Sequence, residues 1–170
     1  TWDTTTGLDE DEIQAIAMSS SGLITLSAES ISIIDMNGVS PINSYEIDAF
    51  GLNGMAVYDE VAYVATDDSG LVRFDIANES FLTPWGSTGV NNANNVPIAV
   101  VGNILHLGLP GYGVVRKDLT TGEILMPLTE SSGGNNPGGG GSSATEILPN
   151  DNIYALISDG SNLYIGTQQG

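Results

Sequence analysis

The feature that most constrains the fold of this chain is an internal repeat. Four times, a short apolar segment is followed by a turn of small or polar residues and then by a second short apolar segment. The β-branched content of these segments and the Gly, Asn, Asp and Ser in the turns are typical of β-hairpins. The four pairs are Ile13–Met18 with Leu23–Ser27, Gly54–Tyr58 with Val61–Thr66, Pro97–Val101 with Ile104–Gly108, and Ile153–Ile157 with Leu163–Thr167.

A third predicted strand follows the hairpin in three of the repeats and ends each time on Asp. These strands are Ile31–Asp35, Leu71–Asp75 and Val114–Asp118, and their Asp residues are 40 and 43 positions apart. A repeat of that length fits a β-propeller blade of four short strands. We interpret the recurring Asp side chains as acceptors of hydrogen bonds from the backbone of the turn that follows.

The repeats predict an all-β chain, a β-propeller built from about four blades. They lie near residues 13–52, 53–95, 96–150 and 151–170, and the last is completed by residues 1–12, because Trp2–Gly7 closely matches Lys117–Gly122. The Gly- and Ser-rich residues 131–144 are expected to form a loop inserted within the domain. The chain then closes as a small ring, belongs to a larger ring of six to eight blades, or completes such a ring as a homodimer.

Charge and composition exclude several kinds of partner and site. The chain has 21 acidic residues against three basic ones, which gives a formal net charge of -18. Nucleic acid is not expected as a partner, because phosphate binding requires clustered Lys and Arg. Membrane insertion is not expected, because no run of 18 apolar residues occurs. Without cysteine, neither a disulfide nor a thiolate metal site can form.

The chain resembles the β-propeller repeats of sensor-type two-component regulators and related extracellular repeat proteins. The resemblance is clearest in Asn152–Gly170, where an Ile-led strand, an Asp-Gly turn and an aromatic-Ile-Gly-Thr strand follow one another, and Asp67–Asp75 is similar to the usual continuation. It implies four-stranded blades around a central channel, with ligands met at the channel mouth or on the loops of one face. An extracellular or periplasmic location is expected, although Thr1-Trp2-Asp3 lacks the features of a signal peptide.

Four residues are candidates for ligand binding, and no residue is a candidate for catalysis. His106, the only histidine, is expected in a strand that faces the channel or a neighbouring blade, and no catalytic motif accompanies it. Arg73 and Arg116 share a repeat position two residues before the recurring Asp, so we expect local ion pairs, with a clamp for a ligand carboxylate as the alternative. Tyr112, in a Gly-rich turn, is expected to point into solvent.

Asp67 and Asp68 are the candidates for a metal site. Their carboxylates, next to Ser69 and Gly70, offer the oxygen ligands that calcium prefers. The spacing is not that of an EF-hand loop, so solvated turn charges are the preferred interpretation. No other cofactor is expected.

These observations predict a non-enzymatic binding or scaffold module. It would recognise a small molecule, a glycan or a protein through loops of one propeller face. The alternative is an enzyme of the lyase or glycosidase type, in which carboxylates from several blades converge on the channel.

Overall fold

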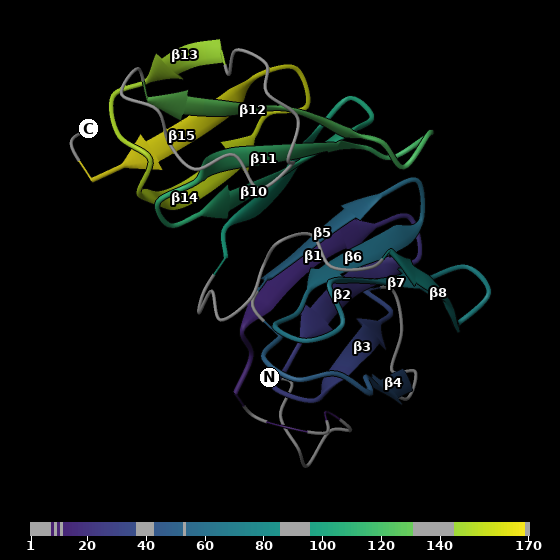
Figure 1. Ribbon diagram of the computed structural model, residues 1–170. Helices are drawn as coiled ribbons and strands as arrows, with labels where there is room; N and C mark the ends of the chain where they lie inside the picture. The colour runs from purple at the N-terminus through teal and green to yellow at the C-terminus, as the bar shows by residue number, and fades with distance from the viewer. Residues whose placement is uncertain are drawn as a thin grey trace. The chain divides into compact units, whose positions relative to one another are not determined.

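The computed structural model of the chain describes residues 8, 10, 12–36, 43–52, 54–85, 96–130 and 145–168. Within these residues it contains fifteen β-strands and no helix (Figure 1). None of the described residues therefore forms a helix long and apolar enough to cross a membrane. The chain divides into two compact units, residues 1–94 and 95–170.

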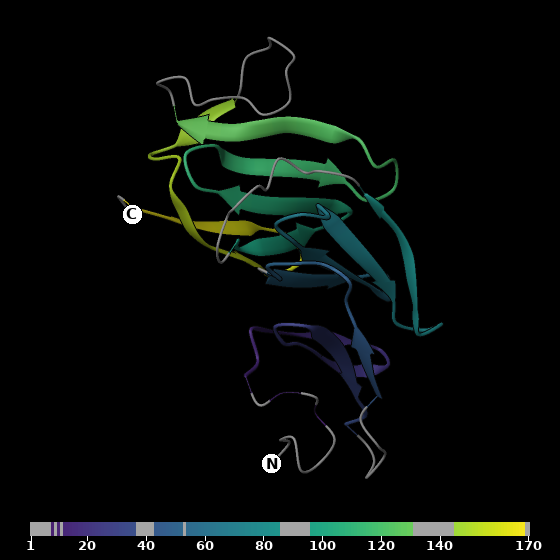
Figure 2. The same cartoon turned by 60° about the horizontal axis from the view of Figure 1, so that its bottom comes forward.

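The first unit contains two antiparallel sheets of four strands, each arranged in chain order (Figures 1 and 2). The first sheet consists of β1 (Ala15–Ser19), β2 (Gly22–Leu26), β3 (Ser30–Ile34) and β4 (Asn43–Glu46). The second consists of β5 (Gly54–Tyr58), β6 (Val61–Ala65), β7 (Leu71–Asp75) and β8 (Ser80–Trp85).

One apolar core joins these two sheets. It includes the fully buried side chains of Ile24 and Ile31 from the first sheet and of Val64 and Phe74 from the second. Residues of β1 alternate between partly buried and exposed, so that Ala15 and Ala17 pack against the core. This alternation follows from the two-residue side-chain period of a strand with one buried face.

The second unit contains a five-stranded sheet and a two-stranded sheet. The larger sheet consists of β9 (Ile98–Val101), β10 (Ile104–Leu109), β11 (Gly113–Asp118), β12 (Ile124–Glu130) and β13 (Thr145–Leu148). Its first four strands are antiparallel in chain order, and β13 adds to β12 in parallel. The smaller sheet pairs β14 (Ile153–Ser158) with β15 (Leu163–Thr167), and its Leu156, Leu163 and Ile165 pack against the core of the larger sheet.

The predicted hairpins and third strands are confirmed. They correspond to β1–β3, β5–β7, β9–β11 and β14–β15, and each complete repeat gains a fourth strand, β4, β8 or β12. Two of the recurring Asp residues have the expected role, because Asp75 accepts a hydrogen bond from the Asn78 backbone and Asp118 accepts them from Thr120 and Thr121. Residues 1–12, which were predicted to complete the last blade, lie outside the described residues except for residues 8, 10 and 12, and the predicted loop 131–144 lies outside them entirely.

Candidate functional site

The structure gives Arg73 and Arg116 the same role in two sheets. Each Arg lies in the third strand of its sheet, next to a β-bulge of the fourth strand that contains a proline, Pro84 in β8 or Pro127 in β12. Proline cannot donate to a sheet ladder, and a bulge leaves a carbonyl oxygen without its usual partner. Arg73 donates to the Thr83 carbonyl oxygen in its bulge, and Arg116 donates to the Met126 carbonyl oxygen in the other.

Distances show that these hydrogen bonds are well formed. Arg73 Nε and Nη2 lie 3.1 and 2.7 Å from the Thr83 oxygen, and Arg116 Nε lies 2.8 Å from the Met126 oxygen. The guanidinium of Arg73 also lies over the Trp85 ring, with Cζ 4.3 Å from its centroid, a favourable cation–π geometry. The expected ion pairs with Asp75 and Asp118 are therefore wrong, because both arginines are used to stabilise a bulge and both Asp residues cap turns.

His106 lies in β10 and is buried, with 6% of its surface exposed. It is paired in register with Ala99 on one side and Arg116 on the other, and its Nδ1 atom is buried without a hydrogen-bond partner. Desolvation, and then the charge of Arg116, lower the pKa of His106, and main-chain contacts with Ile104 oppose the shift. His106 is therefore a neutral strand histidine at pH 7.

Tyr112 is 37% exposed in the turn between β10 and β11, as expected. Its backbone amide donates to the Leu109 oxygen at 3.0 Å, which closes the turn. His106 lies near the middle of the preceding strand, and Arg73 belongs to the other unit. Within the second unit, His106 and Arg116 are thus neighbours, and Tyr112 is placed apart from them at the end of the hairpin.

Asp67 and Asp68 belong to the turn between β6 and β7, which contacts the loop leading into β5. The Asp68 carboxylate accepts a hydrogen bond from the Phe50 amide at 3.0 Å, and the Asp67 amide donates to the Phe50 oxygen at 2.9 Å. The hydrogen bond from Phe50 is the main cause that lowers the pKa of Asp68. Among the described residues, no group of three or more His, Cys, Asp or Glu side chains is placed to hold a metal ion.

The other two turns of the β5–β8 sheet bind the first sheet itself, each through a carboxylate. Glu60 accepts hydrogen bonds from the Ser20 amide at 2.8 Å and the Ser21 hydroxyl at 3.1 Å, and Glu79 accepts from the hydroxyl of Tyr45. Glu60 and Glu79 have positive φ, 56° and 51°, a conformation that costs free energy for a residue with a side chain. The contacts between the sheets offset part of that cost, so these acids are structural.

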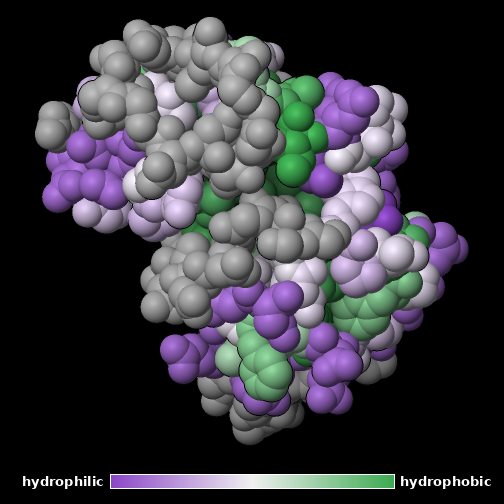
Figure 3. Space-filling view, viewed as in Figure 1, coloured by the Kyte–Doolittle hydropathy of each residue, from purple (hydrophilic) through white to green (hydrophobic). Residues whose placement is uncertain are grey.

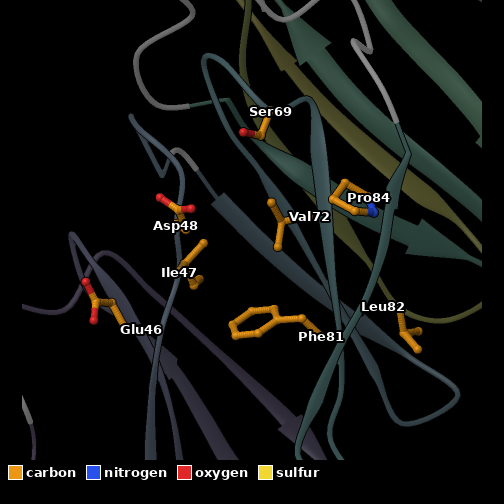
Figure 4. Close-up of a pocket in the computed structure, with 8 residues that line it drawn as sticks. All are labelled: Glu46, Ile47, Asp48, Ser69, Val72, Phe81, Leu82 and Pro84. Carbon is orange, nitrogen blue, oxygen red and sulfur yellow. The ribbon is translucent and has the colours of Figure 1, made fainter.

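A groove lies between β4 with its following loop on one side and β7–β8 on the other (Figure 4). We call it the outer groove, and its cavity measures about 270 Å³. The residues that line it are Glu46, Ile47, Asp48, Ser69, Val72, Phe81, Leu82 and Pro84. In the close-up, the Phe81 ring lies across the middle, the carboxylates of Glu46 and Asp48 lie on the β4 side, and Pro84 lies on the β8 side.

Aromatic packing fixes the position of the Phe81 ring in the outer groove. Phe81 is 44% exposed, and its ring meets the fully buried Phe74 edge-on at 5.0 Å. Phe74 in turn packs against Tyr45 of β4 at 4.9 Å, so the row of three rings connects the two sheets. The space-filling view shows apolar surface next to hydrophilic surface over the β5–β8 sheet (Figure 3). The groove thus presents a supported aromatic face beside carboxylates.

A second cavity of about 310 Å³ shares Glu46 with the outer groove. Among the described residues it is lined by three carboxylates and a serine, Glu10, Glu29, Glu46 and Ser30. One oxygen of Glu10 accepts a hydrogen bond from the Ala28 amide at 3.0 Å. This acidic cavity extends the negative side of the outer groove.

The residues of the outer groove were missed by the sequence analysis. Two signals point to them in retrospect: Leu82-Thr83-Pro84 matches Leu125-Met126-Pro127, and each proline follows an arginine by the same interval, Arg73 or Arg116. This match locates the fourth strand and its bulge. It gives no sign that Glu46 and Asp48 come to line one groove with that strand, because their placement depends on how two sheets pack.

No protein-family model and no curated protein matches the sequence. Solved structures with a similar fold do exist. The computationally designed protein Ika4 shares 15% identity with a TM-score of 0.60, and the match covers 94% of this chain and 87% of Ika4.

Two natural proteins of B. thetaiotaomicron are also similar to this chain. They are extracellular domains described as parts of hybrid two-component systems, BT3049 with 19% identity and a TM-score of 0.62, and BT4673 with 16% identity and a TM-score of 0.62. The matches cover 98% and 91% of this chain. This chain spans only 23% and 19% of the length of those two proteins.

These similarities and the four repeated antiparallel hairpins define the class of fold. The chain has an all-β fold of the β-propeller type, similar to designed proteins and to extracellular domains of two-component systems. At identities below 20%, the comparisons establish the fold. The function must be argued from the site.

Proposed function

We propose that this chain is a non-enzymatic binding module of an extracellular protein and that it takes a small ligand in the outer groove. The observation that carries the proposal is the supported, half-exposed Phe81 ring in a cavity of about 270 Å³. A ligand pocket is characteristically a concave, mostly apolar site with a few polar groups. The outer groove has an apolar floor of Ile47, Val72 and Phe81 and a polar rim of Glu46 and Asp48.

The size of the groove suits a ligand of one ring and a short chain. An apolar cavity of roughly 150 Å³ accepts a benzene molecule, and the outer groove is larger than that. Burial of an aromatic ring against Phe81 and Val72 removes apolar surface from water, at about 25 cal/mol per Å². The extracellular location is supported by the similarity to extracellular domains of B. thetaiotaomicron proteins.

The chemistry of the groove favours binding over catalysis. None of the described lining residues is a histidine, lysine or arginine, and the single histidine is buried in β10 of the other unit. Proton transfer or nucleophilic attack requires a positioned acid, base or nucleophile with an aligned partner. Ser69, the one hydroxyl in the wall, has no histidine or lysine beside it among those lining residues.

A ligand-observed NMR screen with small aromatic and aliphatic compounds tests this proposal. Binding should be lost in Phe81→Ala, which removes the aromatic face. The matched control is Ile124→Ala, because Ile124 is an exposed residue at the corresponding start of β12 and lies outside the groove. If no compound binds, or if both variants lose binding equally, the proposal is wrong.

A further inference from the structure

We propose that the ligand of the outer groove is an organic ammonium ion, a molecule with an apolar body and a positively charged amino group. This inference rests on the proposed function and adds the chemical class of the ligand. It depends on where the charges of the groove lie relative to its apolar surface. The occupant would place its body against Phe81 and its ammonium group beside Glu46 and Asp48.

The apolar part of the site defines one end of the ligand. Ile47 and Val72 are buried, and the exposed part of Phe81 completes the floor beside them (Figure 4). Pro84 forms the opposite side and is held there by the bulge that Arg73 stabilises. Ile47, Val72, Phe81 and Pro84 have no hydrogen-bonding side chain, so the part of the ligand that lies against them is hydrocarbon.

The carboxylates define the other end. Glu46 and Asp48 both lie on the β4 side of the groove: Asp48 lies at its rim, and the Glu46 carboxylate points away from Phe81 toward the neighbouring acidic cavity (Figure 4). No lysine, arginine or histidine stands among the described residues that line the groove. The acidic cavity that shares Glu46 adds Glu10 and Glu29 to the same side. An ammonium group gains Coulomb energy from these carboxylates, whereas a carboxylate ligand is repelled. The formal charge of -18 for the chain acts in the same direction.

The arrangement suits an organic cation better than a metal ion. Among the described residues, the acids of the two cavities are not placed as a group of three that could hold a metal. A calcium ion needs six to eight oxygen ligands and gains nothing from a phenyl ring and aliphatic side chains. An ammonium ion with an aromatic or aliphatic body uses both halves of the site.

Three ligands with the same body and different charge test the inference by isothermal titration or NMR titration. They are 2-phenylethylamine, 2-phenylethanol and 3-phenylpropanoate. We expect the amine to bind about tenfold more tightly than the alcohol and the carboxylate to bind least. Higher salt should weaken the amine and leave the alcohol unchanged, because screening affects only the charged ligand.

Variants distinguish the effect of the local carboxylates on ligand affinity from the effect of the overall negative charge. Glu46→Gln and Asp48→Asn should each weaken the amine roughly two- to fivefold, the range of a partly exposed ion pair, with the alcohol unaffected. Glu123→Gln is the control, because it makes the same change in net charge at an exposed acid of the β11–β12 turn outside both cavities. Phe81→Ala should weaken the amine and the alcohol alike.

The outcomes distinguish the two proposals. If the alcohol binds in the groove as tightly as the amine, the ammonium assignment is wrong and the binding function stands. If Glu123→Gln weakens the amine as much as Glu46→Gln does, the attraction is general and the assignment is again wrong. If none of the three ligands binds and Phe81→Ala changes nothing in the wider screen, both proposals fail.

Discussion

The β5–β8 sheet of the first unit and strands β9–β12 of the second repeat one framework and differ in what they add to it. Both have an arginine, Arg73 or Arg116, that binds a carbonyl in a proline-containing bulge. In the second unit β12 pairs with β11 and with β13, whereas β8 pairs only with β7 among the described strands. Phe81 is the second residue of β8, and the outer groove lies beside it. The repeated residues therefore build the sheet, and the residues that depart from the repeat build the site.

The largest effect on stability is expected from the row of three aromatic rings in the first unit. Phe74 is fully buried between Tyr45 and Phe81, and Lys117 takes its place in β11. Phe74→Ala should lower the free energy of unfolding by about 3–5 kcal/mol, as truncation of a buried aromatic ring does. Urea unfolding followed by circular dichroism measures the loss. Phe81→Ala should cost much less, and an equal cost for both variants would contradict the role assigned to Phe74.

Substitution of either arginine should have an effect of intermediate size on stability, and the two effects can be compared directly. Arg116→Ala removes a charged hydrogen bond to the Met126 carbonyl and should cost about 1–2 kcal/mol. Arg73→Ala also removes the stacking on Trp85, so it should cost about 0.5–1 kcal/mol more. The same urea experiment gives both values. A larger loss for Arg116→Ala would show that the Trp85 contact contributes nothing.

His106 and Tyr63 occupy matching positions in β10 and β6, each paired with the arginine of the next strand. Because the pKa of His106 is lowered in the folded state, the unfolded state binds the proton more readily. Stability should therefore fall as the pH drops below about 6.5, the usual histidine value, and His106→Gln should remove that dependence. As the only histidine, it gives one imidazole signal in an NMR titration. A midpoint at or above 6.5 would refute the assignment.

The smallest effect on stability is expected from the turns that join the first two strands of the two sheets. Asp59-Glu60 joins β5 to β6 and reaches the first sheet through the Glu60 carboxylate, whereas Gly102-Asn103 joins β9 to β10. The hydrogen bond from the Ser20 amide lowers the pKa of Glu60, so its contribution is present above about pH 4.5 and is lost as the pH falls below that value. Glu60→Gln should lower the melting temperature slightly at pH 7 and less at pH 3.5. A loss that is equal at both pH values would show that the charge has no part in this contact.

The sequence predicted the elements that repeat, because local patterns determine them. The four hairpins, the third strands and the capping role of Asp75 and Asp118 follow from alternation and turn composition within about forty residues. The solvent exposure of Tyr112 follows from the Pro-Gly turn that carries it. Each of these features depends on neighbours that are close in sequence.

The site could not be predicted in the same way. Arg73 and Arg116 were expected to pair with the nearest carboxylate, but a bulge in the next strand supplies an unpaired carbonyl that competes for each guanidinium. The outer groove depends on the packing of two sheets, which brings Asp48 and Phe81 to one cavity from positions 33 residues apart. The sequence does not show which acids have which role. The fold shows that Glu60 binds one sheet to the other and that Glu46 lines the groove.

The most direct test of the account is a ¹H–¹⁵N correlation spectrum of the whole chain during titration with 2-phenylethylamine. We expect the amide shifts to concentrate at Ile47, Asp48, Val72 and Phe81, four of the residues that line the outer groove. Shifts that are absent from these residues, or that concentrate instead around the exposed turn of Tyr112, would contradict it.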